Sequence, residues 1–136
     1  MRTYKILAGT AAAAAIALCL GASPAFAATG PGAEAVMLTV NSATSQGVPT
    51  ASQTVSLTCS PVPDDASPSA VAACTSLTGV QGDIAALPAA QTYCPEIYLP
   101  VTASAVGVWD GQQISYQQTF TNQCFLLRAT GPVFNF

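Results

Sequence analysis

Histidine is absent from this 136-residue chain, and its three basic residues are Arg2, Lys5 and Arg128. Without histidine, Ser-His-Asp and Cys-His nucleophile systems and histidine metal sites are excluded. After residue 27 the chain has no lysine either, which excludes Schiff-base chemistry from that part. Carboxylates are the remaining acid–base groups, and the six acidic residues are scattered, with no spacing that indicates a catalytic pair. The composition argues against an enzyme.

The first 27 residues have the pattern of a secretory signal peptide. Arg2 and Lys5 form a positive start, residues 6–20 are an apolar run, and residues 25–27 (Ala-Phe-Ala) form a small-x-small cleavage signal. The apolar run is too short for a membrane span. The sequence therefore predicts a signal peptide at 1–27 and one secreted, extracellular domain at 28–136.

The predicted mature segment is strongly acidic. Its single cation, Arg128, stands against six carboxylates, a formal charge of −5. This charge repels phosphate backbones and anionic lipids, so nucleic-acid and membrane-surface roles are excluded. The expected partners are proteins or neutral ligands, and nothing in the sequence indicates a cofactor.

Removal of residues 1–27 would take away one of the five cysteines and leave an even set. In an exported chain an even set predicts disulfides, and four cysteines allow three connectivities. A tetrathiolate zinc site is not favoured, because no Cys-x-x-Cys pair exists and the compartment is oxidising. We expect two disulfides and no metal site. The four cysteines are Cys59, Cys74, Cys94 and Cys124.

Most of the predicted secondary structure is strand. Residues 53–59 alternate between apolar and polar side chains, and Asp110-Gly111 is a favoured two-residue hairpin turn. Residues 41–52 are rich in Ser, Thr and Ala and are expected to form a long surface loop. One helix is indicated at 68–78, with Ser67 as its cap. The expected strands are 35–40, 53–59, 101–109, 113–120 and an edge strand at 132–136, which together favour an α+β fold with an antiparallel sheet.

The segment Tyr93–Pro100 is the main candidate functional site. Pro95 and Pro100 fix their own φ angles and favour extended geometry in the residues before them, and a disulfide at Cys94 would tie the segment to the body. These constraints predict a stiff loop that presents Glu96-Ile97. On these residues alone, an ordinary surface loop is the competing interpretation.

Several spaced motifs together resemble one known family. In order they are Leu-Thr-Cys (57–59), a helix that carries Cys74, Cys-Pro-x-x-Tyr-x-Pro (94–100), Gly-Val-Trp-x-Gly (107–111), Ser-Tyr (115–116), Phe-x-Asn-x-Cys (120–124) and Val-Phe-x-Phe (133–136). This order resembles the Streptomyces subtilisin inhibitor family over nearly the whole predicted mature chain. The resemblance implies a five-stranded antiparallel sheet with two short helices, and a homodimer formed face to face between sheets.

The resemblance also implies roles for single residues. It pairs Cys59 with Cys74 and Cys94 with Cys124, and it makes Glu96-Ile97 the scissile bond of a reactive loop. Cys94 and Pro95 precede the bond as contact residues, Tyr98 and Leu99 follow it, and Asn122 supports the loop from beneath. Taken alone, Asn122 is an ordinary turn or cap residue.

The implied function is inhibition of serine endopeptidases. Family members usually carry Met, Lys or another long non-acidic residue where this chain has Glu96, so the target is either a subtilisin-type or a glutamate-preferring protease. Two other functions are considered. One is a non-inhibitory secreted interaction protein or transglutaminase substrate that uses the glutamines at 112, 113, 117, 118 and 123. The other is a carboxylate hydrolase, against which the scattered acids argue.

Overall fold

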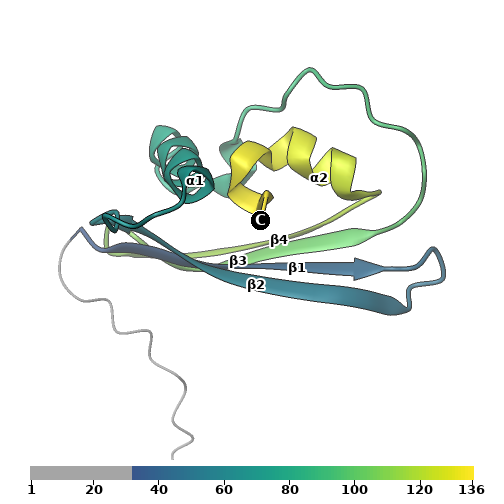
Figure 1. Ribbon diagram of the computed structural model, residues 1–136, viewed down its shortest axis with the longest axis horizontal. Coiled ribbons are helices and arrows are strands. Elements are labelled where there is room, and N and C mark those ends of the chain that lie inside the picture. The colour runs from purple at the N-terminus through teal and green to yellow at the C-terminus, as the bar shows by residue number, and fades with distance from the viewer. Residues whose placement is uncertain (1–31) are drawn as a thin grey trace, which may run out of the picture.

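The computed structural model describes residues 32–136 and shows an α+β fold of two layers (Figure 1). One layer is an antiparallel sheet with the strand order β2-β1-β3-β4. The other contains both α-helices, which lie on the same face of the sheet. The expected signal peptide at 1–27 falls outside the described residues. Among the described helices, none is long and apolar enough to cross a membrane.

The elements follow one another along the chain in the order that the sequence motifs indicate. The Asp110-Gly111 hairpin is confirmed, with both turn residues at positive φ, 46° and 77°. The predicted helix is confirmed too, and the Ser67 hydroxyl accepts a hydrogen bond from the Ala70 amide at 3.2 Å. The elements are β1 Glu34–Ala43, β2 Pro49–Ser60, α1 Pro68–Gly79, the 3₁₀ turn η1 Ile84–Ala86, β3 Val101–Trp109, β4 Gln112–Phe120, α2 Gln123–Thr130 and the 3₁₀ turn η2 Gly131–Phe134.

The expectation of five strands is wrong: the sheet formed by the described residues has four. The edge strand expected at 132–136 is instead the 3₁₀ turn η2. A one-sided strand buries alternate residues, whereas Val133 and Phe134 are adjacent and both are buried. Pro132 also has no backbone N–H to donate to a ladder. The end of the chain therefore packs as a helical turn against α1 and α2.

The expected long loop at 41–52 is also wrong, because most of it belongs to strands. β1 continues to Ala43 and β2 begins at Pro49, so the connection is only residues 44–48. The side chains from Pro49 to Ser56 are all exposed although their backbone pairs with β1. Residues 49–52 bury neither face and so show no hydrophobic alternation, which is why their composition is typical of a loop.

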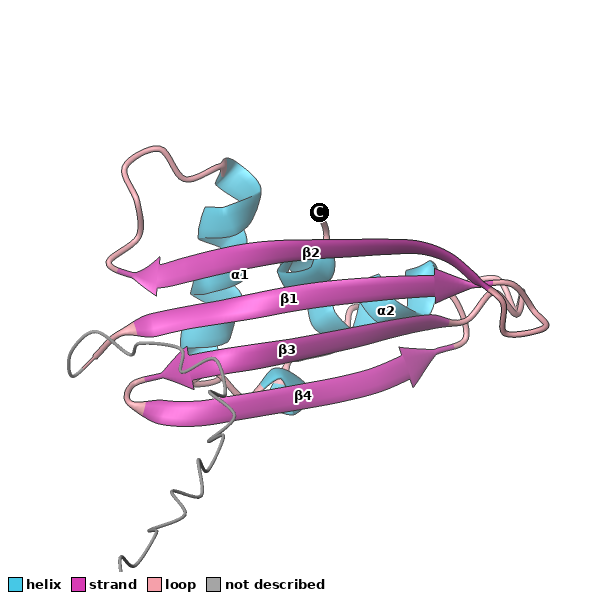
Figure 2. Ribbon diagram, turned by 90° about the horizontal axis from the view of Figure 1, so that it is seen from below, coloured by secondary structure: helices cyan, strands magenta, loops and turns pink. Residues whose placement is uncertain are grey.

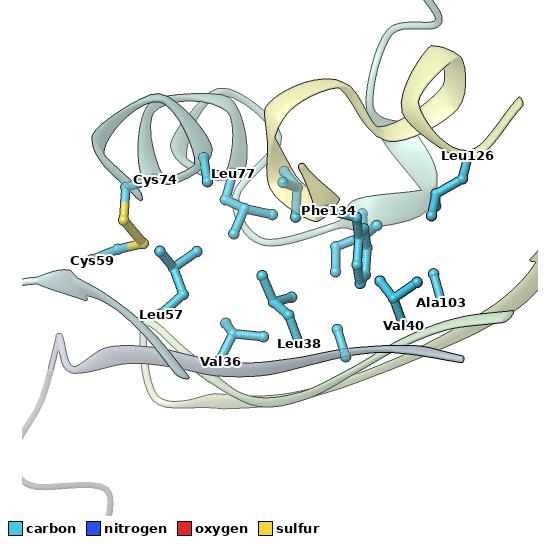
Figure 3. Packing of buried hydrophobic residues seen from close by; sticks show 14 of the residues in the cluster. Val36, Leu38, Val40, Leu57, Cys59, Cys74, Leu77, Ala103, Leu126 and Phe134 are labelled. Carbon is cyan, nitrogen blue, oxygen red and sulfur yellow. A yellow bond between two sulfur atoms is a disulfide. The ribbon is translucent and has the colours of Figure 1, made fainter. Parts of the chain in front are cut away.

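The hydrophobic core lies between the sheet and the helices (Figure 3). Val36, Leu38 and Val40 project from β1 toward Leu77 of α1 and Phe134 of η2, and all five are buried. Each such side chain contributes roughly 1.5–3 kcal/mol by leaving water. The Cys59–Cys74 disulfide joins β2 to α1 at the edge of this core.

The other face of the sheet is not covered by either helix (Figure 2). Apart from Glu34 at the start of β1, the four strands contain no charged residue. Met37 pairs with Ser56 on one side and with Val106 on the other, so a band of uncharged side chains crosses this open face.

Candidate functional site

Residues 87–100, between η1 and β3, have no regular secondary structure, and they form the candidate site. The segment passes α2 on the side away from the sheet and then descends to β3 (Figure 1). Two anchors hold its first half to α2. The Ala90 amide donates to the carbonyl of Arg128 at 2.8 Å, and Cys94 is joined to Cys124 with 5.6 Å between their Cα atoms.

Asn122 connects the middle of this loop to the start of α2. Its Nδ2 group donates to the carbonyl oxygens of Pro95 and Ile97, each at 2.9 Å. Its Oδ1 accepts from the amides of Cys124 at 3.0 Å and Phe125 at 3.3 Å, which caps the helix. With four partners the buried amide uses its full hydrogen-bonding capacity. One side chain thus fixes the backbone on both sides of Glu96.

Two backbone hydrogen bonds hold the last part of the loop. The Leu99 amide donates to the carbonyl of Thr121 at 2.9 Å, just before α2. The Ala43 amide, at the end of β1, donates to the carbonyl of Pro100 at 3.0 Å. The loop is therefore tied at intervals, and little of its backbone is free to move.

The side chains at the centre of the loop face solvent. Glu96 is exposed, and Ile97, Tyr98 and Leu99 are 58%, 58% and 52% exposed. Tyr93 is 88% exposed, the highest value among the exposed large hydrophobic residues of the described part. A rigid backbone that displays several apolar side chains is typical of a surface for binding another protein.

A cleft of about 400 Å³ lies between the loop and the end of the β1–β2 hairpin. Pro95, Ile97 and Leu99 line it from the loop, and Ala43 and Thr44 line it from the hairpin. Glu96 and Tyr98, which alternate with these loop residues, do not line the cleft and are exposed.

No candidate metal site lies near the loop in the described part of the chain. Within residues 32–136 no three His, Cys, Asp or Glu side chains are placed to hold a metal ion.

The guanidinium of Arg128 lies over the ring of Phe125, 4.5 Å from its centroid, on the helix that carries the loop's anchors.

Residues 32–122, which include the whole loop and Asn122, match the family model described as subtilisin inhibitor-like. The chain belongs to the subtilisin inhibitor-like family. The resemblance drawn from the sequence motifs is thereby confirmed. The same match covers all four strands and α1.

Curated relatives agree with this assignment. The chain is 41% identical over 103 residues to subtilisin inhibitor-like protein 4 of Streptomyces lavendulae, which covers 75% of this chain and 89% of the relative. It is 36% identical over 144 aligned positions to a subtilase-type protease inhibitor of Streptomyces coelicolor, and this alignment covers both chains completely. The fold resembles that of Streptomyces caespitosus sermetstatin in its complex with Bacillus licheniformis subtilisin. That likeness has a TM-score of 0.59 and 28% identity, and it covers 77% of this chain and all of the other.

The structure brings most of the predicted site residues together. The segment Cys94–Leu99 lies over Asn122 and Cys124, whereas the Cys59–Cys74 disulfide lies elsewhere and joins β2 to α1. Both disulfides have the pairing that the family resemblance implies.

Tyr93, the first residue of the predicted segment, received no role of its own from the sequence, and the structure shows its side chain almost fully exposed. Two residues beside the site, Ala43 and Thr121, were not identified from sequence patterns. Both act through backbone atoms. Their side chains therefore give no signal in the sequence.

Proposed function

We propose that this protein is a secreted inhibitor of serine endopeptidases, and not an enzyme, and that Glu96-Ile97 is the scissile bond of its reactive loop. The observation that carries the proposal is the position of Asn122, whose amide binds the carbonyls of Pro95 and Ile97 on either side of that bond. This arrangement occurs in a chain that belongs to the subtilisin inhibitor-like family.

The loop would bind a protease as a substrate does. An extended segment adds main-chain hydrogen bonds along the cleft of the enzyme, and its exposed side chains enter the enzyme's pockets. In this binding mode Glu96 enters the primary specificity pocket, Cys94 and Pro95 lie on one side, and Tyr98 and Leu99 lie on the other. Because the backbone is already tied at Cys94, Asn122 and Pro100, little conformational entropy is lost on docking.

The same ties would make cleavage slow and reversible. The catalytic serine oxygen adds to the carbonyl carbon of Glu96, the bond to the Ile97 nitrogen breaks, and that nitrogen takes a proton and becomes an amine. The amine stays beside the ester because Asn122 holds the Ile97 carbonyl. It therefore attacks the ester at high effective concentration and competes with water, so the peptide bond is remade.

Glu96 is proposed to direct the inhibitor to a glutamate-preferring serine protease, with subtilisin-type enzymes bound more weakly. A carboxylate that enters an apolar pocket loses its hydration and gains no partner. A pocket with a positive charge or fixed hydrogen-bond donors replaces those interactions.

Two further features belong to the proposal. Residues 1–27 are a signal peptide, which would place the mature domain, 28–136, outside the cell. The protein would also be a homodimer that pairs through the open face of the sheet. The uncharged band that includes Met37 and Val106 supports this, because pairing it buries no charged side chain of the strands.

The alternative function, a non-inhibitory interaction protein or transglutaminase substrate, has weaker support. Gln113 and Gln117 are exposed on β4, but a solvated strand face explains them equally well. Binding of the loop to a protease separates the two functions.

The experiment is an inhibition assay against a small panel that contains a glutamate-preferring serine protease, a subtilisin, a trypsin-like enzyme and a cysteine protease as control. We expect tight, slowly reversible inhibition of the first, weaker inhibition of the subtilisin and none of the control. Mass spectrometry of the recovered inhibitor should find a cut only between Glu96 and Ile97. A protein that inhibits no serine protease, or is cut elsewhere, would contradict the proposal.

A further inference from the structure

We propose that the end of the β1–β2 hairpin, residues 42–50, is a second support of the reactive loop and holds the leaving side of the Glu96-Ile97 bond in place. This inference rests on the proposed function, because it concerns the loop after a protease has attacked that bond. Both ribbon views place the β1–β2 connection at the end of the sheet where the loop joins β3 (Figures 1 and 2).

The first observation is the hydrogen bond from the Ala43 amide to the Pro100 carbonyl, 3.0 Å long. Ser42 and Val101 are the last residue pair of the β1–β3 ladder, so Ala43 and Pro100 are the next positions along it. Pro100 has no N–H and returns no hydrogen bond. The Ala43 amide is therefore the last hydrogen-bond link between the sheet and the loop.

The second observation is that the hairpin end and the loop share the cleft of about 400 Å³. Ile97 and Leu99, both after the scissile bond, face Ala43 and Thr44 across it. The hairpin end is held together by its own hydrogen bonds. The Thr44 amide donates to the Val48 carbonyl, the Thr44 carbonyl accepts from the Gly47 amide, and the Thr44 Oγ1 accepts from the Val48 amide at 3.1 Å.

The two sides of the scissile bond are thus held in different ways. Before the bond the ties are the Cys94 disulfide and the Pro95 carbonyl. After the bond they are three hydrogen bonds, at the carbonyl of Ile97, the amide of Leu99 and the carbonyl of Pro100. The disulfide survives cleavage as a covalent tie close to the bond, whereas the new amino terminus at Ile97 is joined covalently only through the chain that leads to β3, and non-covalent contacts alone hold it in position.

The hairpin tie should affect resealing of the cut Glu96-Ile97 bond more than docking of the loop to the protease. Once the bond is cut, residues 97–100 form a short free end before β3, and each residue released gains conformational freedom. A free end that moves presents its amine to the ester less often, so hydrolysis gains over resealing. Loss of the hairpin tie should therefore shift the balance from intact to nicked inhibitor, and initial binding should change less.

The test measures the ratio of nicked to intact inhibitor at equilibrium, in the presence of a catalytic amount of the protease that the wild type inhibits. Equilibrium is approached from both the intact and the nicked form. Ala43→Pro removes the donor, and Ala43→Ser keeps it and is the control. We expect the ratio to rise about 2- to 10-fold for Ala43→Pro, the equivalent of one hydrogen bond, and to stay at the wild-type value for Ala43→Ser.

A second pair of variants tests whether the hairpin end supports the loop, even if Ala43→Pro does not fold. Thr44→Gly loosens the hairpin end without removing the Ala43 amide. Thr54→Gly is its matched control, since Thr54 lies on the same strand pair and its hydroxyl is 3.0 Å from that of Thr39, away from the loop. Only Thr44→Gly should raise the nicked fraction and the turnover rate, although both substitutions lower the melting temperature.

The outcomes are distinct. Equal effects of Thr44→Gly and Thr54→Gly, or an unchanged ratio in folded Ala43→Pro, would overturn the hairpin's role and leave the proposed function intact. If no serine protease binds or cuts the wild type at Glu96-Ile97, the proposed function fails, and this inference fails with it.

Discussion

The Asn122 side chain donates a hydrogen bond to the carbonyl oxygen of Ile97 at 2.9 Å, and its other amide hydrogen is used on the carbonyl before Glu96. The same side chain caps α2 through its oxygen. One buried amide therefore supports the loop through its nitrogen and caps α2 through its oxygen. These two roles of Asn122 can be separated by mutation.

Asn122→Asp keeps the capping oxygen and replaces both donors with a second acceptor. A carboxylate facing two carbonyl oxygens repels them, while the cap on α2 is retained or strengthened by the helix dipole. We expect the inhibition constant to rise at least about tenfold, equivalent to about 1.4 kcal/mol, and cleavage at Glu96-Ile97 to become faster.

The control is Asn122→Ala, which loses both the donors and the cap. Its free energy of unfolding should fall by about 2 kcal/mol, more than that of Asn122→Asp in the same urea titration. Equal inhibition by the wild type and both variants would show that Asn122 does not support the loop.

The two disulfides should differ in function but not in their contribution to stability. By the chain-entropy model, loops closed over 15 and 30 residues each contribute about 3–4 kcal/mol. We expect the double variant Cys94→Ser with Cys124→Ser to become a rapidly hydrolysed substrate. Cys59→Ser with Cys74→Ser should lose similar stability and still inhibit at temperatures where it is folded.

Peptide mapping under non-reducing conditions checks the disulfide pairing on which the comparison of the two double variants depends. It should find Cys59 linked to Cys74 and Cys94 linked to Cys124, with no free thiol in the segment 28–136. A peptide linking Cys59 to Cys94 would contradict both the pairing and the argument for a tied loop.

Glu96→Met should change the preferred target. The substitution removes a carboxylate that an apolar pocket cannot solvate, so inhibition of subtilisin should strengthen and inhibition of a glutamate-preferring protease should weaken. With each 1.4 kcal/mol equal to about tenfold in affinity, both shifts should be visible in ordinary inhibition constants. If neither constant changed, Glu96 would not be the primary specificity residue.

The proposed dimer can be tested on the open face of the sheet. Val106→Lys places a charge in the centre of the uncharged band beside Met37, and in the proposed dimer this charge would be buried without a partner. Sedimentation at micromolar concentration should give a dimer for the wild type and a monomer for this variant. Gln118→Lys is the control with the same charge: Gln118 is exposed but pairs with the buried Ala103, so it lies on the helix side of β4, and this variant should stay dimeric. A monomeric wild type would rule out the dimer.

Gly107→Ala should be severely destabilising. A Cβ at this position would overlap the backbone carbonyl of Ala35 on β1 and also meet the Val36 Cα, and neither backbone atom can move aside without disturbing the ladder. We expect a loss of about 3 kcal/mol or more in thermal unfolding. Gly79→Ala at the end of α1, where nothing lies within 4 Å of the new Cβ, should be neutral or slightly stabilising.

Several features could be read from local residues because their causes are local. Ser67 and Pro68 begin α1, and Asp110-Gly111 makes the turn between β3 and β4, since capping and positive φ depend on a few neighbouring side chains. The stiff segment around Cys94 and Pro95 follows from proline geometry in the same way. The order of the motifs along the chain also indicates the family, because motifs can be compared residue by residue without knowledge of the fold.

Other features depend on residues that lie far apart in the chain, and only the tertiary structure shows them. Val133 and Phe134 form a helical turn in which two adjacent side chains are both buried in the core, and a period-two pattern could not show that. The polar half of β2 is a strand because β1 pairs with it, not because it buries apolar groups. The ties from Ala43 and Thr121 to the loop use backbone atoms common to every residue, so only the folded arrangement identifies them.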